Sequence, residues 1–228
     1  MRQLILDLIP EAPPSLDNFV VGGNGEALTG LAAWLAADNR EASLFFWGNA
    51  GAGKTHLLRA CSVHSSAYYL DAASDPNLKN IGAAVATPIG QCLIAVDHVE
   101  ALSASGQVAL FNAFNRLRAG GGRLLTAATV PPLHLALRED LRTRLGSGLI
   151  YRLQALTDDE KIAALTAHAS ARGLRLPADA LAYLLARAPR DMRSLTAFLT
   201  ALDRYSLENK RPITLPLLRD VLRTSPGI

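Results

Sequence analysis

The chain of 228 residues has little cysteine, few aromatic residues and almost no excess of charge. Cys61 and Cys92 lie in apolar stretches, and no second Cys/His pair offers metal-ligand spacing. We therefore expect two buried, reduced thiols rather than a disulfide or a metal site. Basic residues outnumber acidic ones by only 23 to 20, so the composition gives no argument for direct DNA binding.

Long hydrophobic runs are also missing. The first ten residues are interrupted by Asp7 and Pro10, which makes them too short and too polar for a signal peptide, and no later run is long enough to span a membrane. Half of the residues are nevertheless hydrophobic, which is sufficient for a substantial core at this length. We expect a globular, cytoplasmic protein with no membrane role.

The most informative pattern that is present is a phosphate loop at residues 48–55. Its members, with the helical residue that follows, are Gly48, Asn49, Ala50, Gly51, Ala52, Gly53, Lys54, Thr55 and His56. Glycines let the backbone N–H groups turn inward around a phosphate, the lysine reaches the β- and γ-phosphates, and the threonine hydroxyl can ligate Mg²⁺. A chance glycine-rich turn would not explain the strand before, the helix after and the Lys-Thr pair in register.

Hydrophobic periodicity predicts an α/β fold around this loop. Continuous apolar runs at 44–47, 67–70, 91–96 and 123–128 are typical of buried parallel strands. Between the last two, apolar residues at helical spacing predict a helix over 107–118, which the glycines at 120–122 end. Alternating strands and helices predict a three-layer domain.

A helical region follows from about residue 156. Thr157 with Glu160 three residues later predicts a capped helix that ends near Gly173. Helical spacing then continues over 177–188, 191–208 and 214–223. We divide the chain into a tail and linker at 1–15, a nucleotide-binding core at 16–154 and a helical lid domain at 155–228.

Asp97 ends the apolar run 93–97 and is the candidate Mg²⁺ residue together with Thr55. The alternative is an ordinary aspartate at a strand end. The next residue is His98, where many hydrolysing ATPases of this architecture carry an acid that orients water, and a neutral imidazole is a poorer acceptor for that proton. Glu100 could replace the missing acid as a catalytic residue.

The order of these elements resembles the AAA+ ATPases, and among them the DnaA-related proteins. Three segments carry the resemblance, namely 16–22, 140–149 and 191–195. It implies an AAA+ core with a parallel sheet, followed by an all-helical lid. It also implies roles for single residues: Phe19 and Val20 beside the adenine, Thr129 as sensor 1, Arg193 as sensor 2 and Arg144 as an arginine finger acting in trans. From the residues alone, Arg144 could instead pair with Glu139 or Asp140, and Arg193 could be a solvated lid residue.

The first residues resemble the Gln-Leu-x-Leu-x-Leu peptide that binds the bacterial sliding clamp. An extended peptide would present Leu4, Leu6 and Leu8 on one face, while Gln3 supplies hydrogen bonds. The alternative is an edge strand of the protein's own sheet, although the prolines that follow favour a stiff tether.

Taken together, the segments resemble the Hda family, the regulatory inactivators of DnaA. The resemblance implies that the protein binds ADP (or ATP) with Mg²⁺. It implies two partners, DnaA and the sliding clamp, which is the β subunit of DNA polymerase III, so that DNA is reached only through the clamp. Whether the protein also associates with itself stays open. DnaA carries a further DNA-binding domain, whereas this sequence ends at Ile228 after the lid. Thr129 carries no charge, and His98 stands where many hydrolysing ATPases have an acid. Both residues favour a protein that holds its nucleotide and activates the ATPase of DnaA over a fast ATPase.

Two other functions stay open at this point. An oligomeric AAA+ ATPase, such as a helicase or a transposition loader, would share the core and the lid. A phosphate-loop kinase acting on a small metabolite would share the loop, but it would leave the helical lid and the leucine-rich start unexplained.

Overall fold

The structure, a computed structural model, describes residues 13–63, 67–86, 92–174, 176, 178–187 and 191–209. These residues form two compact units, residues 13–155 and the described residues from 156 onward, each with its own hydrophobic core. The candidate clamp-binding residues Gln3, Leu4, Leu6 and Leu8 lie outside the described residues, as does the helix expected over 214–223.

A five-stranded parallel sheet forms the middle layer of residues 13–155, in the order β2-β3-β4-β1-β5. The strands are β1 (Ser43–Trp47), β2 (Ala67–Asp71), β3 (Leu93–Asp97), β4 (Arg123–Ala128) and β5 (Leu149–Arg152). The predicted parallel α/β class is confirmed. Because all strands run the same way, their carboxyl ends share one edge, where ligands of such sheets bind.

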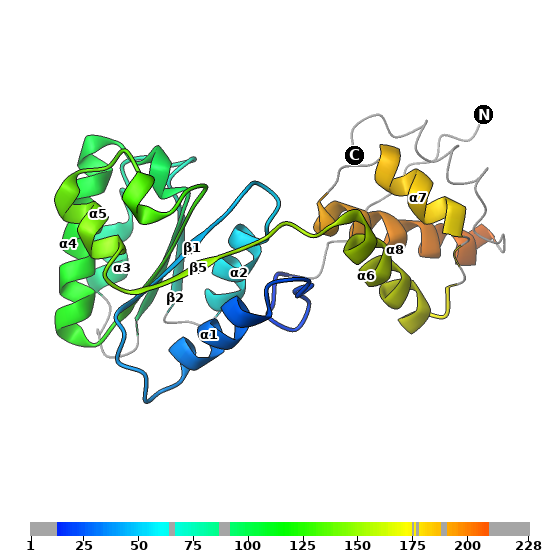
Figure 1. Cartoon of the computed structure of the whole chain (residues 1–228), viewed down its shortest axis with the longest axis horizontal. Helices are drawn as coiled ribbons and strands as arrows, with labels where there is room; N and C mark the ends of the chain where they lie inside the picture. The colour runs from blue at the N-terminus through cyan, green and yellow to red at the C-terminus, as the bar shows by residue number, and fades with distance from the viewer. Residues whose placement is uncertain are drawn as a thin grey trace. The chain divides into compact units, whose positions relative to one another are not determined.

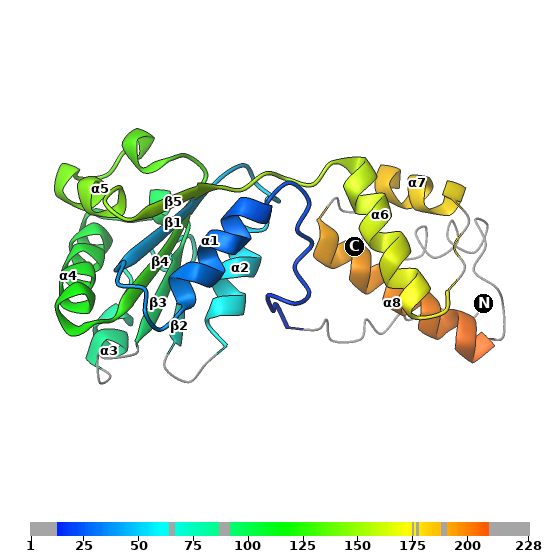
Figure 2. The ribbon, with the colours of Figure 1, turned by 60° about the horizontal axis from the view of Figure 1, so that its bottom comes forward.

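Helices cover both faces of this sheet, as Figures 1 and 2 show. On one face lie α1 (Gly25–Leu35) and α2 (Lys54–Cys61), which bury Trp34, Leu57 and Leu58 against the sheet. On the other face lie α3 (Ile81–Ala86), α4 (Ala104–Gly120) and α5 (Glu139–Leu145), which bury Leu110, Phe114 and Leu141. The predicted three layers are therefore present.

Some elements differ from their predicted bounds. The helix expected over 107–118 starts at Ala104, because the Ser103 side chain accepts a hydrogen bond from Gly106 N–H at the helix start. It ends where Gly121 takes the left-handed conformation at φ 76°. The strand expected at 91–96 begins at Leu93. The edge strand β5 was not predicted at all.

The second unit contains α6 (Asp158–Ala171), α7 (Ala178–Arg187) and α8 (Met192–Asn209) around a core that includes Leu165, Leu184 and Phe198. The capping box expected at the start of α6 is present, with hydrogen bonds in both directions between Thr157 and Glu160. In the part of the chain that the structure describes, no helix combines the length and the apolar character needed to cross a bilayer.

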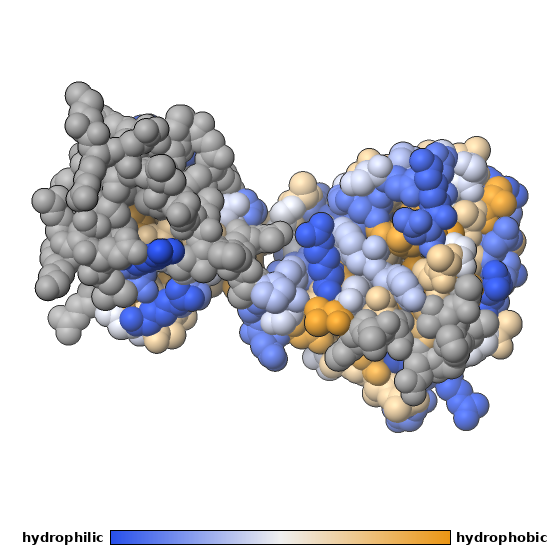
Figure 3. All heavy atoms as spheres, turned by 180° about the vertical axis from the view of Figure 1, so that it is seen from behind, coloured by the Kyte–Doolittle hydropathy of each residue, from blue (hydrophilic) through white to orange (hydrophobic). Residues whose placement is uncertain are grey.

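Large hydrophobic side chains that stay exposed are scattered over residues 13–155. They are Leu16, Val21, Val63, Val108, Leu133 and Ile150. The face drawn in Figure 3 shows small apolar areas among hydrophilic ones. Single exposed apolar residues are normal for a globular surface and do not by themselves mark a docking site.

Candidate nucleotide-binding site

The phosphate loop connects the carboxyl end of β1 with α2. Gly51 and Gly53 have φ of 77° and 92°, a region that residues with a Cβ rarely adopt. A Cβ on Gly53 would also lie 2.6 Å from Cε2 of Phe19. Glycine is therefore required at position 53 by the backbone conformation and by the close approach of an aromatic ring.

Lys54 is held inside the loop. Its side chain is buried, and its Nζ donates to the carbonyl oxygens of Gly48 at 2.7 Å and Asn49 at 2.9 Å. Burial lowers the pKa of Lys54, while the charges of Asp97 and Glu100 oppose that shift. The Lys54 ammonium is thus held by two carbonyl oxygens of the loop whose backbone N–H groups we expect to bind a phosphate.

Thr55 and Asp97 meet at the start of α2. The Thr55 hydroxyl donates to Asp97 Oδ2 at 2.6 Å, and the His98 N–H donates to Asp97 Oδ1 at 3.0 Å. The Asp97 side chain is fully buried. A hydroxyl and a carboxylate beside a phosphate loop are the hard oxygen ligands that suit Mg²⁺, which takes its remaining ligands from phosphate and water. The residues therefore fit a Mg²⁺–nucleotide complex.

His98 is turned toward the neighbouring strand β2. It has a left-handed backbone with φ 53°, and its Nδ1 lies 2.9 Å from Asp71 Oδ1. Burial raises the pKa of Asp71, but hydrogen bonds from His98, the Ala73 N–H and the Ser74 hydroxyl outweigh it and hold this pKa below its usual value. The imidazole is thus engaged with a carboxylate on β2.

Glu100 and Thr129 come together at the ends of β3 and β4. Glu100 lies in a single 3-10 turn at Val99–Ala101, and its Oε1 accepts a hydrogen bond of 3.0 Å from the Thr129 N–H. Its charge also acts on Lys54. The acid that the sequence could not place therefore lies beside the sensor 1 position and within electrostatic reach of the loop lysine.

The segment before α1 lies against the loop. The Phe19 ring packs edge-on against His56 with ring centres 5.5 Å apart, and His56 Nε2 donates to the Ser15 carbonyl at 2.9 Å. Val20 is half-buried beside Phe19. The structure thus brings Phe19, one of the two expected adenine-side residues, to the phosphate loop, and the sequence did not indicate the hydrogen bond between His56 and Ser15 beside it.

Arg144 lies on α5 and is half-buried, with its guanidinium carbon 5.9 Å from the centre of the Phe114 ring. Within the described residues it has no hydrogen bond or ion pair through its guanidinium. Asp140, considered as its partner, is paired with Arg138 at 2.8 Å instead. Arg193 is the second residue of α8, and its side chain lies outside the described part.

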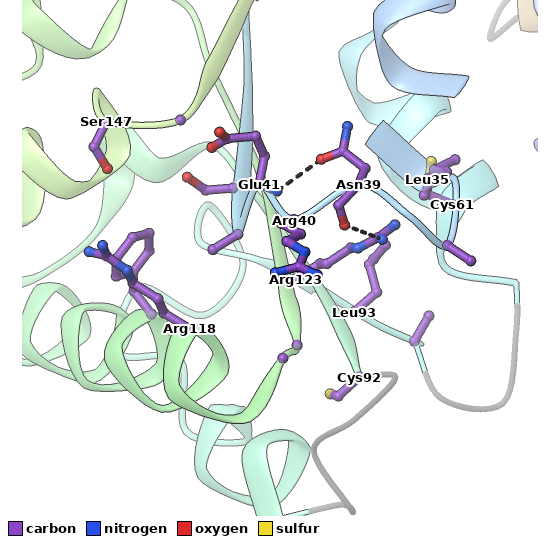
Figure 4. Close-up of a pocket in the computed structure, with 18 residues that line it drawn as sticks. Leu35, Asn39, Arg40, Glu41, Cys61, Cys92, Leu93, Arg118, Arg123 and Ser147 are labelled. Carbon is purple, nitrogen blue, oxygen red and sulfur yellow. Dashed lines mark hydrogen bonds between the residues drawn. The ribbon is translucent and has the colours of Figure 1, made fainter. Parts of the chain in front are cut away.

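A groove lies at the opposite edge of the sheet, where the strands begin (Figure 4). Its lining includes Leu93, Arg118 and Arg123. Arg123 is used to hold the end of α1, because its guanidinium donates to the carbonyl oxygens of Trp34, Ala36 and Asn39. This groove is remote in the topology from the phosphate loop and contains none of the expected nucleotide ligands.

Comparisons with known proteins agree with this geometry. Residues 158–222 match the family described as "Hda, lid domain", and residues 13–75 match the family described as "Bacterial DnaA ATPAse domain". The first match includes the described helices α6, α7 and α8, and the second includes β1, the phosphate loop and α2.

Solved structures show the same fold. Domain III of the Thermotoga maritima replication initiation protein DnaA is 21% identical, with a TM-score of 0.71 over 94% of this chain and 98% of that one. AMPPCP-bound DnaA from Aquifex aeolicus is 21% identical, with a TM-score of 0.66 over 90% of this chain and 71% of that one. A Thermotoga maritima RuvB mutant is 19% identical, with a TM-score of 0.63 over 94% and 72%. The chain is therefore similar to the bacterial DnaA ATPase domain over residues 13–75 and to the Hda lid domain over residues 158–222, and it has the fold of DnaA domain III.

Proposed function

We propose that this protein is a nucleotide-bound regulator that inactivates DnaA by stimulating hydrolysis of the ATP that DnaA holds. ADP or ATP with Mg²⁺ occupies the loop between Gly48 and Thr55. The sliding clamp binds the first segment through Gln3, Leu4, Leu6 and Leu8. The Arg144 side chain contacts the ATP bound by DnaA. Regulation in this form prevents a second initiation. The Hda-type lid and the DnaA-type core support this proposal.

The observation that carries the proposal is the state of Arg144. In the described residues its guanidinium makes no ion pair, whereas the neighbouring Arg138 is bound to Asp140 at 2.8 Å. The Phe114 ring below Arg144 supports the side chain without neutralising it. A free, positioned guanidinium is what transition-state stabilisation in trans needs, and such a group contributes on the order of 10³ to 10⁵ in rate.

The decisive experiment compares three variants in a DnaA ATPase assay with DNA-loaded clamp. Arg144→Ala is expected to abolish the stimulation, and Arg144→Lys to restore little of it, because an ammonium cannot form the planar fork. Arg138→Ala, at the N-cap of the same helix but already ion-paired, is the matched control and should keep most of the stimulation. Full stimulation by Arg144→Ala would rule out the finger assignment.

Clamp docking needs its own test, because the leucine-rich segment lies outside the described residues. Retention on immobilised clamp should be lost when residues 1–9 are removed, and also when Gln3 and Leu6 are both replaced by alanine. A tail-deleted chain that is retained as well as the intact chain would contradict docking through this segment, while leaving the arginine finger untouched.

A second candidate function rests on the position of Glu100. A carboxylate beside Thr129 and near Lys54 could support hydrolysis by this chain itself, as in an oligomeric AAA+ ATPase. Steady-state hydrolysis by the isolated protein, with and without DNA, separates the two functions. Turnover of the order of 1 s⁻¹ or more, as in typical enzymes, would favour the ATPase.

A further inference from the structure

The carboxylate of Asp97 receives a third hydrogen bond that the phosphate-loop pattern does not account for. The Tyr69 hydroxyl donates to Asp97 Oδ2 at 3.2 Å. Tyr69 pairs with Ala95 in the β2–β3 register, so it stands diagonal to Asp97 on the same face of the sheet. Long side chains reach such diagonal neighbours. Tyr69 therefore acts on Asp97 from the strand next to it.

The two carboxylate oxygens of Asp97 accept different numbers of hydrogen bonds. A carboxylate oxygen accepts about two hydrogen bonds. Oδ2 accepts from Thr55 at 2.6 Å and from Tyr69 at 3.2 Å, and is thereby filled. Among the described residues, Oδ1 accepts one hydrogen bond, from the His98 N–H at 3.0 Å, and His98 Nδ1 lies 3.8 Å from it. Oδ1 therefore faces His98, whereas Oδ2 lies beside the Thr55 hydroxyl.

Arg59 holds Tyr69 in place. Arg59 follows Thr55 by four residues on α2, so both side chains leave the same face of the helix. The Arg59 guanidinium carbon lies 4.9 Å from the centre of the Tyr69 ring. The contacts Thr55–Asp97, Asp97–Tyr69 and Tyr69–Arg59 thus start and end on α2 and pass through two strands, which resists rotation of the carboxylate.

We propose that Tyr69, supported by Arg59, is a positioning residue for Mg²⁺: its hydroxyl holds Asp97 Oδ2 beside the Thr55 hydroxyl and so fixes the orientation of the carboxylate that would bind the ion or its water shell. This inference rests on the proposed binding of a Mg²⁺–nucleotide complex by the loop. The donor set fits that role, since outer hydrogen bonds to a metal-site carboxylate fix its orientation and typically contribute about tenfold or more to metal affinity.

The test measures ADP binding by the full chain at saturating Mg²⁺ and in EDTA. Tyr69→Phe keeps the ring against Arg59 and removes only the hydroxyl. It should leave the affinity for ADP in EDTA unchanged and reduce the increase in ADP affinity that Mg²⁺ produces by about tenfold. Tyr68→Phe is the matched control, because Tyr68 is the preceding residue and packs on the other face of the sheet. That variant should keep the full gain.

Each outcome bears on one claim. An unchanged Mg²⁺ gain in Tyr69→Phe, or an equal loss in both tyrosine variants, overturns the positioning role. Absence of ADP binding by the unmodified chain in either condition overturns the proposed nucleotide site instead. If Tyr69→Phe unfolds, Arg59→Met tests the same contact from the solvent side, and its Mg²⁺ gain is expected to fall by a smaller factor.

Discussion

The Thr129 N–H donates to Glu100 Oε1 across 3.0 Å, joining the ends of two neighbouring strands through residues 29 positions apart. Glu100 is thereby directed toward β4, while His98, nearer in sequence to Asp97, is bound to Asp71 on β2. Glu100 is therefore the acid that we propose to act on ATP bound by the phosphate loop. Residual hydrolysis by this chain should depend on it.

We expect Glu100→Gln to lower that residual ATP hydrolysis at least about tenfold, because the amide keeps an acceptor for Thr129 but cannot accept a proton from water. ADP affinity should change little. Single-turnover hydrolysis of bound ATP measures the effect, and His98→Gln provides the comparison. A larger loss in His98→Gln than in Glu100→Gln would transfer the role to the histidine.

A substitution at Gly53 should damage the loop more than the same change at Gly51. Both glycines have positive φ, so alanine costs about 1 to 2 kcal/mol of backbone strain at either position. At Gly53 the new methyl also meets the Phe19 ring, whereas nothing lies within 4 Å of a Cβ on Gly51. The free energy of unfolding, measured in urea, should therefore be lower for Gly53→Ala than for Gly51→Ala.

The double variant Phe19→Ala with Gly53→Ala isolates the steric part. If the ring is the obstacle, removing it should recover part of the loss, which a double-mutant cycle detects as a coupling energy. Strictly additive losses would mean that backbone strain alone is responsible.

Arg123 should stabilise the core from the edge opposite the nucleotide site. Its guanidinium donates at 2.6 Å to Trp34 O, 2.7 Å to Ala36 O and 3.1 Å to Asn39 O, closing the carboxyl end of α1. Arg123→Met is expected to lower the free energy of unfolding by about 2 kcal/mol, since hydrogen bonds from a charged donor are lost and carbonyls are left unpaired. Arg123→Lys should recover only part. Equal stability of all three proteins in denaturant would contradict this.

The lid should lose stability in mild acid through His168. Its Nε2 is buried without a hydrogen-bond partner in the described residues, and burial, followed by the charge of Arg172, lowers the pKa of His168. The unfolded chain then binds more protons than the folded lid between this lowered pKa and the ordinary value of 6.5. The contribution to stability is complete above 6.5 and is lost as pH falls below it.

His168→Gln should flatten this dependence. Thermal unfolding followed between pH 7.5 and 5, conditions chosen to bracket the ordinary pKa, measures the slope in both proteins. His134→Gln is a suitable control, because His134 is exposed at the end of the 3-10 turn Pro132–His134. An identical slope in the wild type and in His168→Gln would show that the histidine is not responsible.

The parts of the molecule that local chemistry dictates could be predicted from the sequence. The phosphate loop depends on glycines at fixed offsets, the buried strands on continuous apolar runs, and the start of α6 on the Thr157–Glu160 capping box. β5 was missed because Leu149–Arg152 is short and alternates half-buried with exposed residues at the sheet edge. Its pattern is too weak to distinguish from a loop.

The contacts that complete the site could not be predicted, because they depend on strand order. Tyr69 reaches Asp97 and Asp71 reaches His98 only because β2 lies beside β3 in this register. Glu100 reaches Thr129 only because β4 flanks β3 on the other side. A sequence specifies these pairings through the whole sheet, and no local spacing signals them.

The bond between Ser15 and His56 has a mechanical consequence. His56 follows the threonine that completes the phosphate loop, and its ring nitrogen Nε2 donates a hydrogen bond to the Ser15 carbonyl, where the chain enters the core. A pulling force on the chain ahead of Ser15 would therefore act on the first turn of α2 through this hydrogen bond. When the phosphate loop holds a nucleotide, as we propose, the force would act on the helix turn that directly follows the loop.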